Sequence, residues 1–402
     1  MYWKQVIKKI IFPIISIFFI PIKLIVPKKR VVILQTYSRK LYCENTRYLY
    51  EFLSEEGSVD AYWVTDHPKI KAYLKSKGWK YITTHNPIKM IWISLLARVV
   101  VDSGLGFFNI LNLTGGKSVI KITTLHGSGP KATLSRSDDI MTAVRQILNI
   151  NKFNYVNFTS NYSAYFVGKK TFFLPNDKII TLGYPRCDKY FDHEYVVSRY
   201  NEKSVAKSMN SSIGKESKII LYTPTWRPYK YDFPLNNMPD FSAYDFNQWL
   251  QSHNLFFFYT VHSNLFPENL PDNLSRIIFI NPDLNPLFDI NEFMLEVDIL
   301  VNDYSTTSTD FSILNRPQLF YMPDYDFYDS EKCFVENYKE ILPGREVASY
   351  EDLKSALVDA SSAPESYVQE YQMATNELQR KYYDRGAGDS ARRFSSFIQE
   401  IM

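Results

Sequence analysis

Short apolar runs alternate with amphipathic stretches over most of the chain. The first run, RVVILQ at Arg30–Gln35, is rich in β-branched residues and is typical of a buried strand. Asn45–Gly57 follows, with apolar residues at helical spacing and a glycine that predicts the helix end. Further predicted strands lie at Ala61–Asp66 and Arg98–Gly104. Such strand–helix alternation predicts a parallel sheet with right-handed crossovers.

The alternation resumes after Lys178. Predicted strands follow at Lys178–Gly183, Lys218–Trp226, Leu255–His262, Arg276–Asn281, Ile299–Asp303 and Gln318–Pro323. Two successive α/β segments, each of about the size of one domain, fit a chain of 402 residues. We therefore predict an α/β fold with two Rossmann-like domains, residues 30–177 and 178–402, whose ligands bind at the carboxyl ends of the strands.

Residues 1–29 have a different pattern. Residues 10–22 read IIFPIISIFFIPI, a run of 13 residues that is apolar apart from Ser16. A helix of this length spans roughly 20 Å, less than the roughly 30 Å of a hydrocarbon core, and two prolines interrupt its hydrogen bonding. We therefore predict a membrane anchor that lies in the interface on the cytoplasmic face rather than one that spans the bilayer. A secretory signal peptide is the alternative, but no small-residue cleavage site follows the run.

Charge supports the same interpretation. The first 30 residues contain seven basic residues and no acidic one, whereas the remainder holds 39 Lys and Arg against 43 Asp and Glu. A basic N-terminal segment suits an anionic membrane surface. The acidic remainder excludes nucleic acid as the principal partner. The cysteines, Cys43, Cys187 and Cys333, lie far apart, with no metal-binding spacing, and are typical of a reducing compartment.

Two polar turns in the first half of the chain could carry chemistry. His126 opens a Gly-Ser-Gly-Pro turn whose backbone N–H groups could approach an anion, and Lys131 follows it. Arg186 lies in the turn GYPRCDKY, Gly183–Tyr190. A histidine in a polar turn directly after an apolar run is a better candidate than the remaining histidines, His67, His85, His193 and His253, which we expect to be surface residues.

Three further polar segments follow predicted strands of the second half. YTPTWRP contains Thr225 and Arg227, and TVHSN contains His262. VNDYSTTSTDF places Asp303 at a strand end and Ser305 and Thr306 at a helix start. Hydroxyls and unpaired N–H groups at a helix start suit an anion. The same pattern alone is most often a simple N-cap.

Together these segments resemble the CDP-glycerol glycerophosphotransferase family, the teichoic-acid primases and polymerases. The family shows a His-Gly-Thr turn followed by lysine, then G-x-PR-x-D, PT-x-R, a second histidine and D-Y-S-S before D-F. The matching residues are His126-Gly127-Ser128 with Lys131, Gly183 to Asp188, Pro224 to Arg227, His262, and Asp303 to Thr306 with Asp310-Phe311. The resemblance covers roughly residues 31–345. The turn beside His126 reads Leu-His-Gly-Ser-Gly-Pro-Lys instead of the usual Trp-His-Gly-Thr-Pro-Leu-Lys. Because of this difference the resemblance does not fix the identity of the acceptor.

The resemblance implies a glycosyltransferase-B-like fold with the donor in the C-terminal domain. It implies transfer of glycerol phosphate, or a related polyol phosphate, from CDP-glycerol or CDP-ribitol to a hydroxyl of a lipid-linked acceptor, with release of CMP. His126 and His262 would be catalytic, His126 as the general base. The donor's phosphates would be bound by Arg186, Thr225, Arg227, Ser305 and Thr306, and less strongly by Lys131. Asp303 or Asp310 would order the loop or bind hydroxyls of the donor. It implies no organic cofactor and leaves a divalent cation open.

Two alternatives remain. A nucleotide-sugar glycosyltransferase of cell-surface polysaccharide synthesis would share the fold and transfer a hexose. A catalytically inactive membrane scaffold would not need His126. A single addition is slightly favoured over polymerisation, because the extra domains of long polymerases are absent from this sequence.

Overall fold

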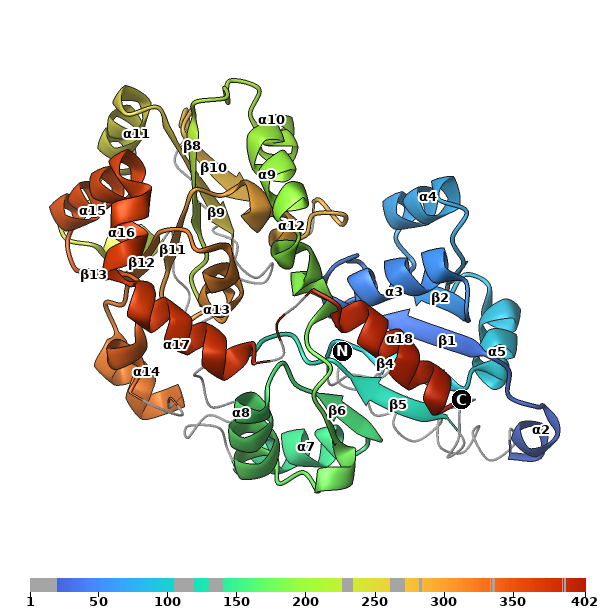
Figure 1. The fold of residues 1–402 in the computed structure, drawn as a ribbon. Coiled ribbons are helices and arrows are strands. Elements are labelled where there is room, and N and C mark those ends of the chain that lie inside the picture. The colour runs from blue at the N-terminus through green and yellow to red at the C-terminus, as the bar shows by residue number, and fades with distance from the viewer. Residues whose placement is uncertain are drawn as a thin grey trace.

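The structure is a computed structural model that describes residues 20–104, 119–129, 140–225, 234–260, 272–281, 284–332, 334, 337–384, 386 and 388–402. These residues form two lobes, each built on a parallel sheet (Figure 1). Helices cover the faces of both sheets, as expected for parallel strands buried on both sides. The predicted α/β class with two parallel sheets is confirmed.

The first sheet has the strand order β3-β2-β1-β4-β5-β6-β7. Its strands are β1 (Val31–Gln35), β2 (Asp60–Val64), β3 (Tyr81–Ile82), β4 (Val99–Asp102), β5 (Ile120–Thr123), β6 (Tyr155–Asn157) and β7 (Ile179–Ile180). All described pairs are parallel, with Gln35 opposite Asp102 at the ends of β1 and β4. The strand order reverses between β1 and β4, so a crevice opens beyond their carboxyl ends.

Helices of the first lobe begin and end where local sequence signals place them. They are α2 (Ile20–Ile25), α3 (Glu44–Glu56), α4 (Pro68–Ser76), α5 (Pro87–Leu96), α7 (Ile140–Ile150), α8 (Asn161–Ser163) and the π-helix η1 (Ala164–Thr171). Both α4 and α5 start with proline after a capping side chain, His67 and Asn86 respectively. Gly57 ends α3 at φ 71°, a left-handed conformation that glycine adopts without strain.

The second sheet has the order β10-β9-β8-β11-β12-β13. Its strands are β8 (Lys218–Tyr222), β9 (Leu255–Thr260), β10 (Ile277–Ile280), β11 (Ile299–Asn302), β12 (Gln318–Tyr321) and β13 (Arg345–Val347). The order reverses between β8 and β11, which gives a second crevice of the same kind. All six strands predicted between Lys178 and Pro323 are present, five of them in this sheet and the first, β7, in the other sheet.

The helices around the second sheet are α9 (His193–Glu202), α10 (Ser204–Met209), α11 (Ala243–Ser252), α12 (Ile290–Phe293), α13 (Thr307–Phe311), α14 (Tyr325–Lys332), α15 (Tyr350–Ser362), α16 (Pro364–Glu370) and α17 (Gln372–Tyr382). Short 3₁₀ helices are η2 (Asn176–Lys178), η3 (Pro185–Phe191), η4 (Pro234–Asn237), η6 (Met294–Glu296), η7 (Ser312–Leu314) and η8 (Tyr338–Ile341).

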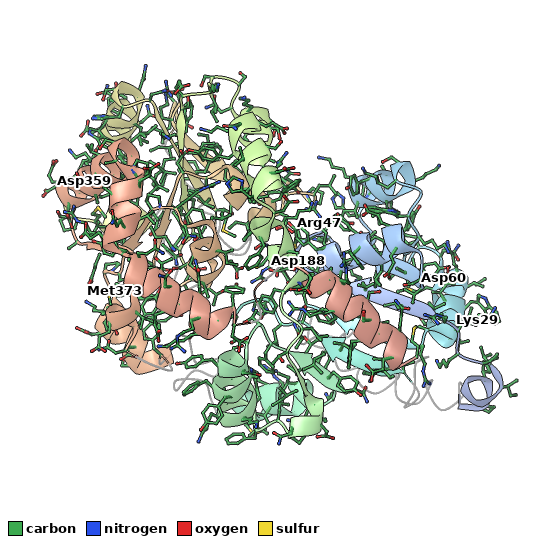
Figure 2. All side chains as sticks on the ribbon, viewed as in Figure 1. Lys29, Arg47, Asp60, Asp188, Asp359 and Met373 are labelled. Carbon is green, nitrogen blue, oxygen red and sulfur yellow. The ribbon has the colours of Figure 1, made fainter. Side chains whose placement is uncertain are left out.

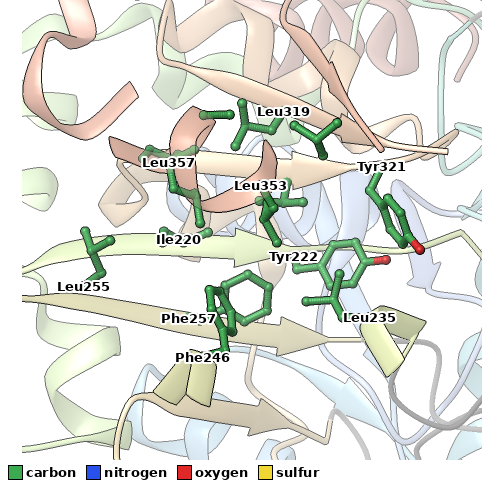
Figure 3. Packing of buried hydrophobic residues seen from close by; sticks show 14 of the residues in the cluster. Ile220, Tyr222, Leu235, Phe246, Leu255, Phe257, Leu319, Tyr321, Leu353 and Leu357 are labelled. Carbon is green, nitrogen blue, oxygen red and sulfur yellow. The ribbon is translucent and has the colours of Figure 1, made fainter. Parts of the chain in front are cut away.

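A large apolar core fixes the strands of the second sheet. Figure 3 shows Tyr222 and Phe257 from the sheet packed with Phe246 of α11 and with Leu353 and Leu357 of α15. All five side chains are at most 1% exposed. Burying each such side chain stabilises the fold by about 1.5–3 kcal/mol. The loops that follow β8 and β11 therefore start from strands that a well-packed core holds in place.

Two segments cross the domain boundary predicted at 177/178. Strand β7 pairs with β6 in the first sheet, although it was expected to open the second domain. The last helix, α18 (Ser390–Glu400), returns to lie beside α3 in Figure 1, and Phe394 and Ile398 join the first lobe's core. The predicted boundary is thus too early, and it misses the return of the C-terminus to the first lobe. The hydrophobic pattern of a short strand or an amphipathic helix does not show which sheet that element joins.

The predicted membrane anchor, residues 1–29, lies mostly outside the described residues; α2 is its described part. Within the portion of the chain that is described, no helix has both the length and the apolar character needed to cross a bilayer.

Candidate active site

The two lobes meet around a pocket of about 280 Å³. One wall comes from the loop after β1 and the start of α3, and includes Tyr37 and Glu44. The opposite wall comes from the ends of β8 and β9 and the turn after β11, and includes Thr223, Thr260 and Ser305. A pocket between the carboxyl ends of two doubly wound sheets is the usual ligand site of this architecture.

Asp303 orders the second wall. Its carboxylate accepts hydrogen bonds from the Thr225 backbone N–H at 2.9 Å and from the Thr225 hydroxyl at 2.7 Å. It also accepts hydrogen bonds from the backbone N–H groups of Tyr304 and Ser305. Asp303 is only 1% exposed. It therefore joins the turn after β8 to the turn after β11, which is the loop-ordering role expected for it.

The turn Ser305–Thr307, which we call the donor turn, starts α13. The Ser305 and Thr307 hydroxyl oxygens are 2.9 Å apart, and both residues line the pocket. The N-cap residue of α13, Thr306, makes no side-chain cap hydrogen bond, but Ser305 Oγ accepts from the Thr307 backbone N–H at 3.4 Å. Because α13 has only five residues, its dipole is weaker than the sequence pattern implied. The hydroxyls are therefore the main groups that this turn can offer an anion, since the N–H groups of Ser305 and Thr307 already donate to Asp303 and Ser305 respectively.

The segment Leu125–Gly129, which we call the His126 turn, is held by its carbonyl oxygens. Arg186 Nη1 donates to the His126 carbonyl at 3.0 Å, and the Tyr184 hydroxyl donates to the Gly127 carbonyl at 3.0 Å. The Ser128 hydroxyl accepts from Thr159 at 2.7 Å and is buried. The His126 side chain itself is exposed. Tyr184, Arg186 and Thr159 thus fix the backbone of this turn, while His126 is exposed.

These two turns touch across the lobes. A Cβ atom at Gly127 would lie 2.6 Å from Thr306 Oγ1, and one at Gly129 would lie 3.0 Å from Thr306 Cγ2. A Cβ atom at Gly127 would force the Thr306 side chain or one of the two turns to shift, since real Cβ contacts are essentially never shorter than 3.0 Å. The structure therefore brings together His126, Ser305 and Thr306, which are separated by about 180 residues in the sequence.

Arg186 joins the lobes and is 3% exposed. Its Nη1 lies 2.6 Å from Glu44 Oε2, and its Nη2 lies 2.7 Å from Asp310 Oδ2. Asp310 also accepts a hydrogen bond from the Tyr383 hydroxyl. A guanidinium with two carboxylate partners, the buried Asp310 and the partly exposed Glu44, is already neutralised. In this arrangement Arg186 positions the His126 turn, and the phosphate contact expected for it stays a prediction.

Glu44 and Asp289 are pocket residues that the sequence analysis missed. The Glu44 backbone N–H donates to Asp289 Oδ2 at 3.1 Å, which links α3 to the N-cap of α12. Burial raises the pKa of the Glu44 carboxyl to about 7, against the opposing effect of Arg186. An acidic residue just after the first strand of a doubly wound sheet was the available signal. Figure 2 shows Arg47, which pairs with Glu292 of the second lobe at 2.9 Å, beside the same junction.

Three predicted site residues, Lys131, Arg227 and His262, lie outside the described residues. Their described neighbours in sequence, Thr225 and Thr260, are at the ends of β8 and β9. Of the cysteines, Cys187 is buried and Cys43 lines the pocket, where burial raises the pKa of its thiol; Cys333 is outside the described residues. Among the side chains that the structure describes, no group of three or more His, Cys, Asp or Glu is placed to hold a metal ion.

Comparisons with known proteins agree with this geometry. A family model described as CDP-glycerol:poly(glycerophosphate) glycerophosphotransferase matches residues 18–400. The teichoic acid glycerol-phosphate primase of Bacillus subtilis (strain 168) is 27% identical over 385 residues, covering 92% of this chain and 88% of the primase. The teichoic acid poly(glycerol phosphate) polymerase of Bacillus spizizenii is 27% identical over 417 residues, covering 97% and 96% of the two chains.

Among solved structures, the wall teichoic acid polymerase TagF superposes with a TM-score of 0.74 at 19% identity, over 97% of this chain and 92% of that one. This likeness confirms the two-domain fold. The family match extends over nearly the whole chain and confirms the resemblance drawn from the motifs. The chain belongs to the CDP-glycerol:poly(glycerophosphate) glycerophosphotransferase family and is a glycerophosphotransferase.

Proposed function

We propose that this enzyme transfers glycerol phosphate from CDP-glycerol to a hydroxyl of a membrane-linked glycan or polyol-phosphate acceptor, in teichoic-acid or capsule-type polymer synthesis. The contact between the His126 turn and the donor turn carries the proposal. The contact joins the backbone next to His126 to Thr306 of the other lobe, which supports an arrangement in which an acceptor and a donor bound to the two lobes meet near it.

In the proposed reaction, the acceptor oxygen forms a bond to the β-phosphorus of CDP-glycerol. The bond from that phosphorus to the oxygen bridging to CMP breaks, and CMP leaves with the electron pair. His126 accepts the proton of the attacking hydroxyl, a task that suits imidazole near neutral pH. The donor turn, with Thr225, Arg227 and His262, stabilises the charge on the diphosphate.

Donor identity is tested by supplying the purified enzyme with CDP-glycerol, CDP-ribitol and UDP-hexoses and identifying the nucleotide released. Acceptor-dependent release of CMP from a CDP-polyol supports the proposal, and the preferred polyol separates glycerol from ribitol. Acceptor-dependent release of UDP would contradict it and favour a nucleotide-sugar glycosyltransferase. Repeating the assay with added Mg²⁺ and with a chelator decides whether a divalent cation takes part.

The proposed location is the cytoplasmic face of the membrane, with an anionic lipid surface as partner. The basic, apolar first 30 residues motivate this. At their end, Lys28 Nζ donates to the Leu95 carbonyl of α5 at 2.8 Å, so that α2 and α5 are joined. Ile25 of α2 and Ile88 and Trp92 of α5 are 79%, 81% and 52% exposed. Such side chains insert readily into a lipid interface.

Removing residues 1–28 tests the location. The shortened protein should stay folded and lose most of its binding to anionic vesicles, and binding of the full chain should weaken as salt rises. A full chain that resists extraction by both high salt and carbonate would contradict an interfacial anchor and favour a spanning segment.

A further inference from the structure

The pocket between the lobes has an acidic wall. Its described lining residues include Glu44 and Asp289 and contain no lysine or arginine. A phosphate at this end would compete with Glu44 and Asp289 for the arginines that already pair with them, Arg186 and Arg47, which is unfavourable in a partly buried site. Neutral hydroxyl groups, by contrast, are good donors to a carboxylate. The chemistry of this wall therefore suits the polyol part of a substrate rather than its phosphates.

Glu44 has one carboxylate oxygen committed and one available. Oε2 pairs with Arg186 at 2.6 Å, whereas among the described residues none hydrogen-bonds to Oε1. The side chain is 18% exposed and lines the pocket. Asp289 differs, because its side chain is fully buried and its oxygens accept from the backbone of Glu44 and Asn291. Glu44 is thus the acidic residue of this wall that can accept a hydrogen bond from a ligand.

The backbone at Glu44 is strained. Its φ is 70°, in the left-handed region that residues other than glycine rarely adopt. This conformation costs about 1–3 kcal/mol and persists where surrounding contacts enforce it, commonly at ligand sites. Here the hydrogen bond from its N–H to Asp289 and the ion pair with Arg186 provide those contacts.

We propose that Glu44 is a specificity-determining residue that binds a polyol: its Oε1 accepts a hydrogen bond from a hydroxyl of the glycerol unit. The inference rests on the proposed function, because the substrate class is taken from it. The hydroxyl belongs either to the donor's glycerol or to the glycerol that ends the acceptor. Ser305 and Thr307, on the facing wall of the same pocket, are hydroxyls that the same unit can contact.

The experiment compares substrates with and without the free hydroxyls. In the donor arm, binding of CDP-glycerol and of CDP-propanol is measured by isothermal titration. In the acceptor arm, kcat/KM is measured for acceptors that end in glycerol phosphate or in propanediol phosphate, which keeps the reactive primary hydroxyl. One charge-assisted hydrogen bond predicts a preference for the glycerol compound of roughly 10- to 100-fold in one arm of the wild-type comparison.

Glu44→Gln should reduce that preference to about threefold or less, since a neutral amide forms a weaker hydrogen bond. Glu51→Gln is the matched control. Glu51 lies on the same helix and pairs with Arg47 at 3.0 Å, but it does not line this pocket. It should keep the wild-type preference. Glu44→Asp, which retains the charge but withdraws the oxygen, should behave like Glu44→Gln.

Loss of the preference in the donor arm assigns the hydroxyl to the donor, and loss in the acceptor arm assigns it to the acceptor. Wild-type enzyme that transfers glycerol phosphate but shows no preference in either arm overturns the inference and leaves the proposed function intact. The inference is also overturned if Glu44→Gln and Glu44→Asp keep the full preference. Wild-type enzyme that neither binds nor uses any CDP-polyol overturns the proposed function itself.

Discussion

Gly127 of the His126 turn and Thr306 of the donor turn lie so close that a Cβ atom at Gly127 would be 2.6 Å from the Thr306 hydroxyl oxygen. The two residues come from different lobes, so in the proposed reaction this contact sets the distance between the acceptor side and the donor side. A close backbone approach of this kind is one of the few reasons for a glycine that does not depend on its φ angle.

Gly127→Ala should therefore separate the two turns. We expect turnover to fall by a factor on the order of 10 to 100, because small displacements of reacting groups are costly. Gly214→Ala is the control, since among the described residues only Ser217 Oγ, at 3.8 Å, lies near its added Cβ. Steady-state kinetics of both variants provide the measurement. Wild-type turnover in Gly127→Ala would show that the contact is not needed for catalysis.

Arg186→Ala should mainly destabilise the protein. It removes the cation between Glu44 and Asp310 and leaves both carboxylates buried without it. A loss of about 3–5 kcal/mol in the free energy of unfolding is expected, measured by urea denaturation. Arg380→Ala, which breaks an exposed pair with Glu377, should leave stability unchanged. If Arg186→Ala loses donor affinity with little loss of stability, the direct phosphate contact is favoured instead.

Asp102→Asn should change how stability depends on pH. Asp102 is fully buried at the end of β4, and burial raises the pKa of its carboxyl from 3.8 to about 6. Between these values the unfolded chain releases the proton while the folded protein keeps it, so the Asp102 contribution to stability falls as pH rises and is constant above about 6. The stability of the variant relative to wild type should increase across that window, by about 1.4 kcal/mol per pH unit at most.

The measurement is the free energy of unfolding of both proteins from pH 4 to pH 8. A difference between Asp102→Asn and wild type that does not change with pH would mean that the Asp102 carboxyl titrates alike in the folded and unfolded states.

Replacing both Ser305 and Thr306 by alanine should weaken use of the donor. The double variant removes two hydroxyls of the donor turn, and hydrogen bonds to a charged group contribute about 1.5–3 kcal/mol each. We expect kcat/KM for CDP-glycerol to fall by roughly tenfold or more. Ser330→Ala, which removes an exposed hydroxyl from α14, is the control. Unchanged kinetics in a folded double variant would remove the donor turn from the site.

The sequence predicted the two sheets well because their strands are short, apolar and bounded by turns. Gly57 also marked the end of α3 correctly. The pattern could not show which sheet or lobe each element joins. β7 is apolar like its neighbours, and only its pairing with β6 assigns it to the first sheet. The amphipathic α18 likewise gave no sign that it packs on the first lobe.

The sequence predicted several residues of the candidate site, but it could not predict the contacts between them. The motifs named His126, Arg186, Asp303, Ser305 and Thr306, but nothing in a sequence shows that Gly127 meets Thr306. The roles of buried charges were also hidden, since Arg186 reads as an anion ligand until its partners are seen. Glu44 was missed because a single acidic residue at a helix start is common, and only the fold places it against a pocket.

The central claim is tested most directly by the single-turnover rate of His126→Ala, with its affinity for CDP-glycerol measured in parallel by isothermal titration. In the proposed arrangement His126 serves the acceptor, so donor affinity should be nearly unchanged while the rate falls by a factor on the order of 10² to 10⁴. His262→Ala, if that residue contacts the diphosphate, should instead lose affinity and rate together. A His126→Ala enzyme that loses donor affinity and keeps its chemical rate would contradict the account, and the general base would have to be another residue.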